Sequence, residues 1–480
     1  MTDVTDVTDV WTHEGYELVC GLEVHVELAT ASKLFSPAAN RFGDDPNTNI
    51  DPVCVGLPGT LPVLNRHAVE LAIRLGLALE CDIRPSIFAR KNYFYPDMPK
   101  DFQISQYELP ICSDGRLELP GGHVVGIERA HLEEDTGKTT HVGGGGRIHD
   151  ATYSLVDYNR SGVPLLEIVS RPEVRTPDQA REYASELRAI LLATGVSDAR
   201  MEEGSMRVDA NVSVRPIGSD ELRTRCEIKN LNSIRSLGRA IEYEAKRHIA
   251  LYEDGEASVQ ETRHWDEDGG RTHTLRSKEE AYDYRYFADP DLPPLTPDPA
   301  WIERIAADLP PLPAARRHQL ADAAGVAASE AALVVERGLD GLCLATIAEG
   351  ADAGRVLVHA TQNLSDGADG LAPGAFAALV GMEVGGDLTA TQAKQVLAEM
   401  VETGRGPAEI AADRGFEAMD SGDLHSIVDE VVAASPDEWQ RFVEGDQKVM
   451  GFFVGQVMKR TQGQADGKAV SARLRELAQA

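Results

Sequence analysis

The sequence predicts a multidomain protein in which an α+β region is followed by two all-α regions, and three observations lead to this expectation. A chain of 480 residues is longer than one ordinary domain. From Tyr16 to Leu295, short alternating apolar and polar runs are broken by Gly, Pro and Asn, which is typical of strands with a few helices. Prolines then cluster between Pro290 and Pro313, and text rich in Ala, Leu and Glu follows, which favours helices.

The expected domain limits follow from these changes in composition. Residues 1–15 carry a repeated Thr-Asp-Val triplet, and we expect a disordered extension there. The predicted domains are an α+β domain at 16–296, a helical domain at 297–407 and a small helical tail domain at 408–480.

The charge of the chain excludes a general binder of polyanions. The sequence has 78 acidic and 47 basic residues, a formal net charge of −31. Long-range repulsion would slow its approach to nucleic acid, so any RNA contact must come from a local basic patch. One such patch lies between Asp446 and Ala480, with six basic and three acidic residues. It indicates either RNA contact by the tail or an ordinary solvated helix face.

The cysteines and the N-terminus predict the compartment. Six cysteines are scattered without a C-x-x-C pair, which favours reduced thiols over disulfides or a zinc ribbon. The N-terminus is acidic where a signal peptide would be basic, and no apolar stretch approaches the roughly 18 to 20 residues of a membrane span. We therefore expect a cytoplasmic protein without a membrane partner.

The first candidate site lies on a strictly alternating run from Leu22 to Leu28. In such a strand Glu23, His25 and Glu27 share one face, with successive members about 7 Å apart. Two carboxylates and an imidazole can converge on one hard cation such as Mg²⁺. A solvated strand face stays open as the alternative.

Two further segments carry carboxylates. His131-Leu132-Glu133-Glu134-Asp135 precedes Gly137-Lys138-Thr139, a combination that suits either a Mg²⁺-nucleotide or an acidic turn. The phosphate-loop motif fails, because its first glycine would be at position 132, which is leucine. Glu167 is a lone charge inside the apolar run Leu165–Val169, where it is costly unless it is paired or binds a metal.

Charged faces recur on other predicted strands. Two alternating runs carry them: Arg207, Asp209, Asn211 and Ser213 in one, and Arg223, Arg225, Glu227 and Lys229 in the other. Several such faces in one sheet could form a phosphoryl-transfer site, or an exposed sheet face with cross-strand charge pairs. The run Arg90–Lys100 mixes aromatic and basic side chains, which is typical of base stacking or of a core strand with basic flanks.

Taken in order, these motifs resemble the B-subunit family of the aspartyl/glutamyl-tRNA amidotransferases, and the resemblance covers essentially the whole chain. The motifs that carry it are GLEVHVEL from Gly21, RKNYFYPD from Arg90, QISQ from Gln103, HLEED from His131, DYNRSGVPLLEI from Asp157, EIKNLNS from Glu227, DYRYF from Asp283 and MGFFVGQVMK from Met450.

The resemblance implies a fold and a reaction. The fold is a cradle domain with a mainly antiparallel sheet, similar to glutamine synthetase and guanidino kinases, then an all-α domain and a tRNA-binding tail. The reaction is ATP-dependent phosphorylation of the side-chain carboxylate of Glu-tRNA(Gln) or Asp-tRNA(Asn), followed by amidation with ammonia from glutamine. The implied partners are an amidase A subunit, a small C subunit and misacylated tRNA. Which of the two tRNAs is used, or whether both are, stays open.

Carried over to this sequence, the resemblance implies a catalytic group of Glu23, His25, Glu133, Glu134 and Glu167. The Mg²⁺ ligands among them are expected to be Glu23, His25, Glu134 and Glu167. Strand parity favours Glu133 as the inward residue, whereas a bulge would select Glu134, so that choice stays open. The expected ATP contacts are Lys91, Arg207, Asp209, Arg225 and Lys229. The sequence offers no convincing Cys-His or Ser-Lys amidase constellation, so we expect glutamine hydrolysis on another polypeptide.

Overall fold

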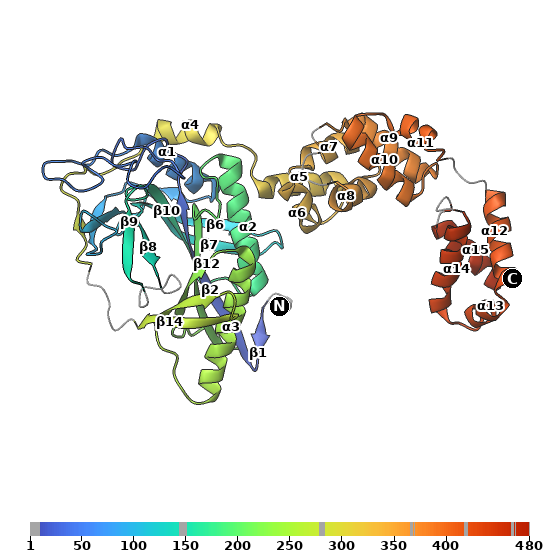
Figure 1. Cartoon of the computed structure of the whole chain (residues 1–480), viewed down its shortest axis with the longest axis horizontal. Coiled ribbons are helices and arrows are strands. Elements are labelled where there is room, and N and C mark those ends of the chain that lie inside the picture. Colours follow the sequence, from blue (N-terminus) through green and yellow to red (C-terminus); the bar gives the residue numbers. More distant parts are fainter. Residues whose placement is uncertain are drawn as a thin grey trace, which may run out of the picture. The chain divides into compact units, whose positions relative to one another are not determined.

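The computed structural model describes residues 10–143, 151–277, 284–364, 368, 370–416, 421–461, 465 and 467–479. Residues 1–9 of the predicted extension and Asp283 of one motif lie outside the described residues. The chain divides into two compact units, Met1–Ala314 and Ala315–Ala480, coloured blue to yellow and yellow-orange to red in Figure 1. No helix in the described part of the chain is both long and apolar enough to cross a membrane.

The first unit is built on a 13-stranded sheet. The order of its hydrogen-bonded strands is β14 (Arg271–Ser277), β13 (Glu261–Asp266), β12 (Cys226–Leu231), β11 (Met206–Pro216), β2 (Tyr16–Glu27), β10 (Pro164–Ser170), β7 (Val124–Glu134), β5 (Phe102–Ser105), β4 (Ala89–Asn92) and β15 (Phe287–Ala288). Off this path lie β1 (Thr12–His13), which pairs with β2, β6 (Cys112–Glu118), which pairs with β7, and β3 (Asp82–Ile83), which pairs with β6. The pairing of β12 with β13 is parallel, and the other pairings among these strands are antiparallel. Strands β8 (Lys138–Val142) and β9 (Tyr153–Asp157) form a separate antiparallel pair.

The helices of the first unit are α1 (Arg66–Ala78), α2 (Pro177–Thr194), α3 (Ile234–Glu253) and α4 (Pro299–Ala307). Local sequence explains where they begin. Helix α2 starts after Thr176, whose hydroxyl accepts a hydrogen bond from the Gln179 N–H, with Pro177 at the first helical position. Helix α3 starts after Ser233, whose hydroxyl accepts from the Ser236 N–H. Both helices thus have side-chain caps encoded next to their apolar stripes.

One face of the sheet packs against these helices and the other face is polar. Apolar side chains of β2, β10 and β11, such as Val24, Ile168 and Val208, share one buried core with side chains of α1, α2 and α3, such as Leu187 and Ile241. Because side chains alternate along a strand, the polar residues between them lie on the opposite face. That face carries the candidate site.

The second unit is helical throughout its described residues. Its helices are α5 (Pro313–Ala324), which begins at the boundary, α6 (Ala328–Glu336), α7 (Asp340–Ala348), α8 (Ala353–Gln362), α9 (Pro373–Gly385), α10 (Ala390–Thr403), α11 (Pro407–Asp413), α12 (Ser421–Ala434), α13 (Pro436–Val443), α14 (Met450–Arg460) and α15 (Gly467–Gln479), with a 3₁₀ turn at Gln447–Val449. They enclose two separate hydrophobic clusters, one around Phe376 and one around Phe453. The predicted succession of a sheet-containing region and a helical C-terminal region is confirmed.

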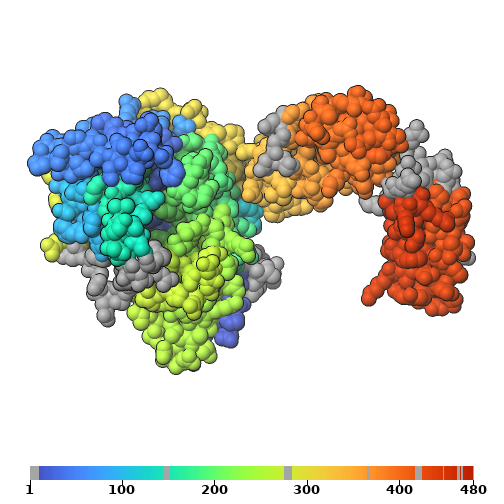
Figure 2. All heavy atoms as spheres, viewed as in Figure 1, coloured from blue at the N-terminus to red at the C-terminus, as the bar shows by residue number. Residues whose placement is uncertain are grey.

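At three of the predicted domain limits, residues on one side of the limit pack with the domain on the other side. Residues 12–13 form β1, where a disordered extension was expected, because the Trp11 N–H donates to the Arg175 carbonyl and β1 pairs with β2. Helix α4 follows position 296 but packs on α1, as its yellow residues beside the blue ones show in Figures 1 and 2. Ile410 of α11 follows position 407 but belongs to the core around Phe376.

One open alternative is excluded and one local expectation was wrong. Of the two alternatives for the acidic segment, a turn is excluded at Glu133 and Glu134, since β7 continues to Glu134 with regular pairing to β10. The predicted strand from Arg223 to Lys229 begins only at Cys226, so Arg223 and Arg225 lie in the preceding loop.

Candidate active site

Strand β10 decides which polar side chains meet, because it pairs with β2 on one side and with β7 on the other. Glu167 of β10 lies opposite His25 of β2 and opposite His131 of β7. Side chains directly opposite one another in antiparallel strands point to the same face. The register therefore brings together one carboxylate and two imidazoles that are far apart in the chain.

Glu133 joins them from the next position of β7 on the same face. One ligand atom from each of His25, Glu133 and Glu167 lies within 4.8 Å of the others. His25 Nδ1 is 3.6 Å from Glu133 Oε1, and His131 Nε2 is 3.6 Å from Glu167 Oε2. We call His25, His131, Glu133 and Glu167 the acid–imidazole group. Its two carboxylates are chemically suited to a hard cation such as Mg²⁺, which prefers oxygen ligands, and an imidazole would be a less usual member of the shell.

The charges of this group are strongly coupled. Burial lowers the pKa of His25, but a hydrogen bond with Glu133 and the charges of Glu167 and Asp209 outweigh it and raise the pKa to about 9. Burial opposes the ionisation of Glu133, yet His25 and Lys91 hold its pKa at about 2. His25 is therefore an imidazolium near neutral pH, and binding a metal through its nitrogen would release this proton.

Glu23 lies beside the acid–imidazole group. It is opposite Asp209 of β11, and its Oε1 accepts a 2.9 Å hydrogen bond from Asn211 Nδ2. Burial raises the pKa of Glu23, and the charges of Glu167 and Glu227 raise it further. With Glu23, three arginines line a cavity of about 370 Å³: Arg129, Arg223 and Arg225.

Glu134 does not join the group. Its Oε1 lies 2.5 Å from Lys100 Nζ and accepts a 3.0 Å hydrogen bond from the Ile104 N–H. The side chain is buried, and the pairing of β7 with β10 contains no bulge at Glu133 or Glu134. Of the two alternatives left open by the sequence, the regular strand therefore brings Glu133, and not Glu134, to the group.

Three of the five expected ATP contacts line a second, larger cavity. This cavity measures about 680 Å³ and also reaches His25 and Glu133. The three are Arg207, Asp209 and Lys229. Lys229 Nζ donates to Asp209 Oδ2 at 2.6 Å, and Arg207 Nη2 donates to Asp135 Oδ2 at 2.9 Å. Both cations are therefore held in place by carboxylates at the wall of the cavity.

The other two expected contacts lie elsewhere around the group. Lys91 contributes positive charge beside Glu133, and its Nζ is 4.8 Å from the centre of the Tyr284 ring. Arg225 lines the smaller cavity with Glu23. The structure thus distributes the predicted cations on more than one side of the acid–imidazole group.

Sequence reasoning gave no role to His131, Arg129 or Arg160. His131 is two residues before Glu133, so strand parity alone could have placed it on the same face. Arg129 Nη2 is 3.9 Å from Glu167 Oε1, again at a same-face position of β7. Arg160 lines the larger cavity from a loop, and no periodicity of the sequence indicates its position.

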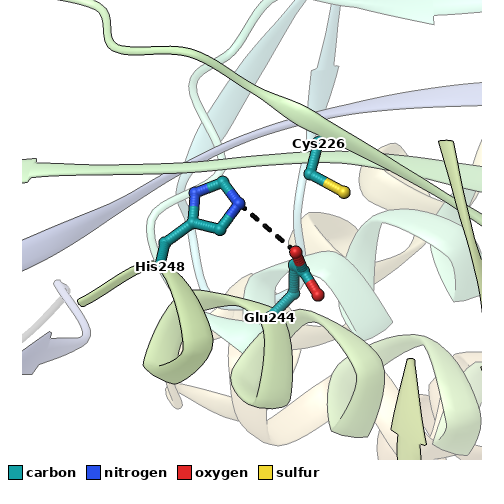
Figure 3. A group of neighbouring side chains, drawn as sticks. All are labelled: Cys226, Glu244 and His248. Atoms are coloured by element: carbon teal, nitrogen blue, oxygen red, sulfur yellow. Dashed lines mark ion pairs between the residues drawn. The ribbon is translucent and has the colours of Figure 1, made fainter. Parts of the chain in front are cut away.

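A second cluster of candidate metal ligands lies under the sheet, and Figure 3 shows it. Ligand atoms of Cys226 on β12 and of Glu244 and His248 on α3 lie within 4.8 Å of one another. The imidazole points toward the carboxylate one helical turn away, with His248 Nε2 3.3 Å from Glu244 Oε1 (Figure 3). All three side chains are buried.

The contacts of Glu244 show that this cluster is an ion-pair network. Arg247 Nη2 donates to Glu244 Oε1 at 2.5 Å, Thr272 Oγ1 donates to Oε2 at 2.8 Å, and Arg263 Nε lies 3.5 Å from Oε2. Burial opposes the ionisation of Glu244, but His248 and Arg247 outweigh it and hold its pKa well below the ordinary value. Two guanidinium groups already compensate this charge and would repel a metal cation. The network joins α3 to the strands β13 and β14.

We predict that Glu244→Gln lowers the free energy of unfolding of the first unit by about 3 to 5 kcal/mol, because two guanidinium groups lose their buried counter-charge. The matched control is Glu242→Gln on the same helix, where an exposed carboxylate faces Lys246, with an expected change below about 1 kcal/mol. Calorimetry measures both. Since the folded pKa of Glu244 is depressed, its contribution is complete above the ordinary pKa near 4.5 and is lost as the pH falls below it. A difference in the free energy of unfolding between the wild type and Glu244→Gln that has the same size at pH 7 and at pH 3 would contradict the role of Glu244 as a buried, ionised partner of the arginines.

Comparisons with known proteins show the family of this chain. A family model described as the GatB/GatE catalytic domain matches residues 18–303, and one described as the GatB domain matches residues 355–477. A relative from Moorella thermoacetica, named as the B subunit of aspartyl/glutamyl-tRNA(Asn/Gln) amidotransferase, is 48% identical over 96% of this chain and 99% of its own length. A relative of the same name from Salinispora arenicola is 49% identical over 95% of each chain. The chain belongs to the family of aspartyl/glutamyl-tRNA(Asn/Gln) amidotransferase B subunits.

Proposed function

We propose that this chain is the ATP-using subunit of a tRNA-dependent amidotransferase. It would phosphorylate the side-chain carboxylate of Glu-tRNA(Gln), Asp-tRNA(Asn) or both, and support its conversion to the amide with ammonia from glutamine. The observation that carries the proposal is the acid–imidazole group, which adjoins a cavity of about 680 Å³ lined by Arg207 and Lys229. Membership of the family supports the same reaction.

The reaction explains why ATP is needed. A carboxylate is a poor acyl donor, since its leaving group would be oxide. Transfer of the γ-phosphoryl group to a carboxylate oxygen gives an acyl phosphate and ADP. Ammonia then attacks the carbonyl carbon, the bond to phosphate breaks, and amide and inorganic phosphate leave. The protein has to hold the phosphates of ATP next to the substrate carboxylate, although both are negatively charged, and exclude water from the acyl phosphate.

The residues of the acid–imidazole group fit Mg²⁺. Glu133, Glu167 and, after loss of its proton, His25 would hold the ion, and a bound Mg²⁺ would neutralise charge on the phosphates and the incoming carboxylate. Glu23 and Asp209 carry further negative charge beside the group. His131 is a positioning residue for the carboxylates of Glu133 and Glu167, at 3.9 and 3.6 Å.

Cations of the chain complete the proposed phosphate site. Arg207 and Lys229 would bind the phosphates of ATP, because both line the cavity and are oriented by acidic partners. Lys91, which lies close enough to Glu133 to influence its pKa, would face the transferring group from another side. Arg225 with Arg129 would present positive charge on the side of Glu23.

The architecture is part of the proposal. We assign the phosphorylation and amidation chemistry to a cradle domain at 16–296, similar in fold to glutamine synthetase and guanidino kinases. The helical domain at 297–407 would connect it to a tRNA-binding tail at 408–480. The proposed partners are an amidase A subunit and a small C subunit, as well as misacylated tRNA.

The kinase site predicts a specific pattern of losses. Glu167→Gln and Glu133→Gln should each reduce tRNA-dependent phosphoryl transfer at least about 100-fold, because each removes a charge that compensates the metal and orients the imidazoles. Binding of Glu-tRNA should stay within about twofold. The measurement is ATP consumption by the assembled complex with misacylated tRNA and free ammonia. Glu80→Gln, which removes an exposed carboxylate paired with Arg116 outside both cavities, is the control and should keep full activity. Full activity in Glu167→Gln would remove that residue from the site.

The cysteines support the expectation that glutamine is hydrolysed on another subunit. All six are buried, and a nucleophilic cysteine must be accessible and readily ionised. Cys226 lies near His248, but burial, followed by the charge of Glu244, raises its pKa far above the ordinary value. That pair therefore does not meet the requirements of an amidase nucleophile.

We predict that the purified chain alone releases no ammonia from glutamine above the uncatalysed rate, and that adding the amidase partner restores release. An enzyme-coupled ammonia assay measures both conditions. Robust release by the isolated chain would refute this division of labour.

The structure of the tail supports RNA contact less strongly than the number of basic residues in its sequence does. Arg460 pairs with Glu430 and Arg473 pairs with Asp429, so two of the six basic side chains face acidic partners of α12. Three others, Lys448, Lys459 and Arg475, are exposed. Any electrostatic contribution of the tail would come mainly from these exposed cations.

We predict that removal of residues from about 411 onward weakens binding of misacylated tRNA about tenfold or more and leaves the KM for ATP unchanged. The measurement is amidation with free ammonia by the assembled complex at two salt concentrations, because phosphate contacts weaken as salt rises. Charge reversal at Lys448 and Lys459 in the full-length chain is the control for damage to α11, whose Ile410 packs in the core around Phe376. Unchanged tRNA binding in both variants would exclude the tail.

A further inference from the structure

Three neighbouring tyrosines lie beside the acid–imidazole group, in the segments that follow β5 and precede β15. The rings of Tyr107 and Tyr286 are stacked with their centres 4.1 Å apart and their planes 10° apart. Tyr284 packs edge-on against Tyr286 at 5.9 Å, and Lys91 Nζ lies 4.8 Å from the centre of the Tyr284 ring. We call Tyr107, Tyr284 and Tyr286 the tyrosine shelf.

Strand pairing positions the shelf next to the candidate active site. Ser105 of β5 lies opposite Glu133 of β7, and Tyr107 follows Ser105 by two residues. Between them, the Gln106 N–H donates to the Leu132 carbonyl, which keeps this segment on β7. Burial, and then the nearby charges of Glu133, Tyr284, Tyr107 and Glu167, raise the pKa of Tyr286. The shelf therefore lies close to Glu133 of the acid–imidazole group.

Part of the shelf is open to solvent. Tyr107 is 55% exposed, and Phe287, which follows Tyr286 in the chain, is 49% exposed, whereas Tyr284 and Tyr286 are half-buried. Exposed aromatic rings next to a cation are the surface on which single-stranded nucleotides stack. An ATP molecule, by contrast, has a cavity of about 680 Å³ lined by Arg207 and Lys229.

We infer that the tyrosine shelf binds the 3′-terminal bases of the misacylated tRNA by stacking, and this rests on the proposed function. The carboxylate to be phosphorylated is joined to the terminal ribose through one short amino-acid side chain. When that carboxylate reaches the acid–imidazole group, the terminal base must lie next to the group. The shelf is an aromatic surface beside Glu133 of that group, and Lys91 next to it carries the charge opposite to that of the RNA backbone.

The test uses the assembled complex with Tyr107→Ala and Tyr107→Phe. Tyr107→Ala removes an exposed ring and should raise the KM for Glu-tRNA at least about fivefold, the loss of one stacked base, while the KM for ATP stays unchanged. Tyr107→Phe keeps the ring and should behave like the wild type. A raised KM for ATP with an unchanged KM for tRNA would overturn the inference and assign the shelf to the adenine of ATP.

Direct binding separates this inference from the proposed function. The trinucleotide CpCpA, a model of the tRNA end, should bind the full-length wild-type chain at least about fivefold more tightly than Tyr107→Ala, with no catalysis required. Equal binding to both chains, or a KM for tRNA unchanged in Tyr107→Ala, would overturn the stacking role while leaving the phosphorylation proposal intact. Failure of the wild-type complex to amidate tRNA at all would instead count against the proposed function.

Discussion

The candidate site depends on the double pairing of one short strand. Strand β10 has seven residues and is hydrogen-bonded on both sides, to β2 and to β7. Its apolar side chains, such as Leu166 and Ile168, are fully buried against the helices, which fixes the face on which Glu167 must lie. The energy that orients Glu167 therefore comes mostly from hydrophobic burial on the far side of the sheet. The polar face need not be stable by itself.

This arrangement explains how many like charges coexist on one surface. Glu133 and Glu167 are close together, yet the cationic side chains of His25, Lys91 and Arg129 lie beside them. On the covered face, the charge of Glu244 is compensated by Arg247 and Arg263. Arginines are permanently charged, so they would repel a metal cation there. A metal ion that binds to His25 would displace a proton from this imidazole, whereas the arginines around Glu244 keep their protons.

The sequence predicted the parts of the site that follow from alternation along one strand, such as Glu23 and His25 on β2 and Glu167 on β10. It left Glu133 and Glu134 undecided, because that choice depends on the presence of a bulge, which pairing with another strand determines. It misplaced Arg225, since nothing in the alternation marks where β12 begins. It missed the contact of Tyr107 with Tyr286 because strand order, which local pattern does not encode, brings these distant segments together.

The opposite surroundings of Glu133 and Glu134 have a consequence for the folding of β7. A slip of one residue in its pairing would move Glu134 into the position of Glu133 beside the imidazoles, Glu133 into the buried position of Leu132, and Asp135 into the position that faces Lys100. Lys100 and the Ile104 N–H both bind Glu134. These contacts stabilise the observed pairing at the end of β7, where two identical side chains are adjacent. The ion pair between Glu134 and Lys100 thus favours the register in which Glu133, and not Glu134, lies beside the imidazoles.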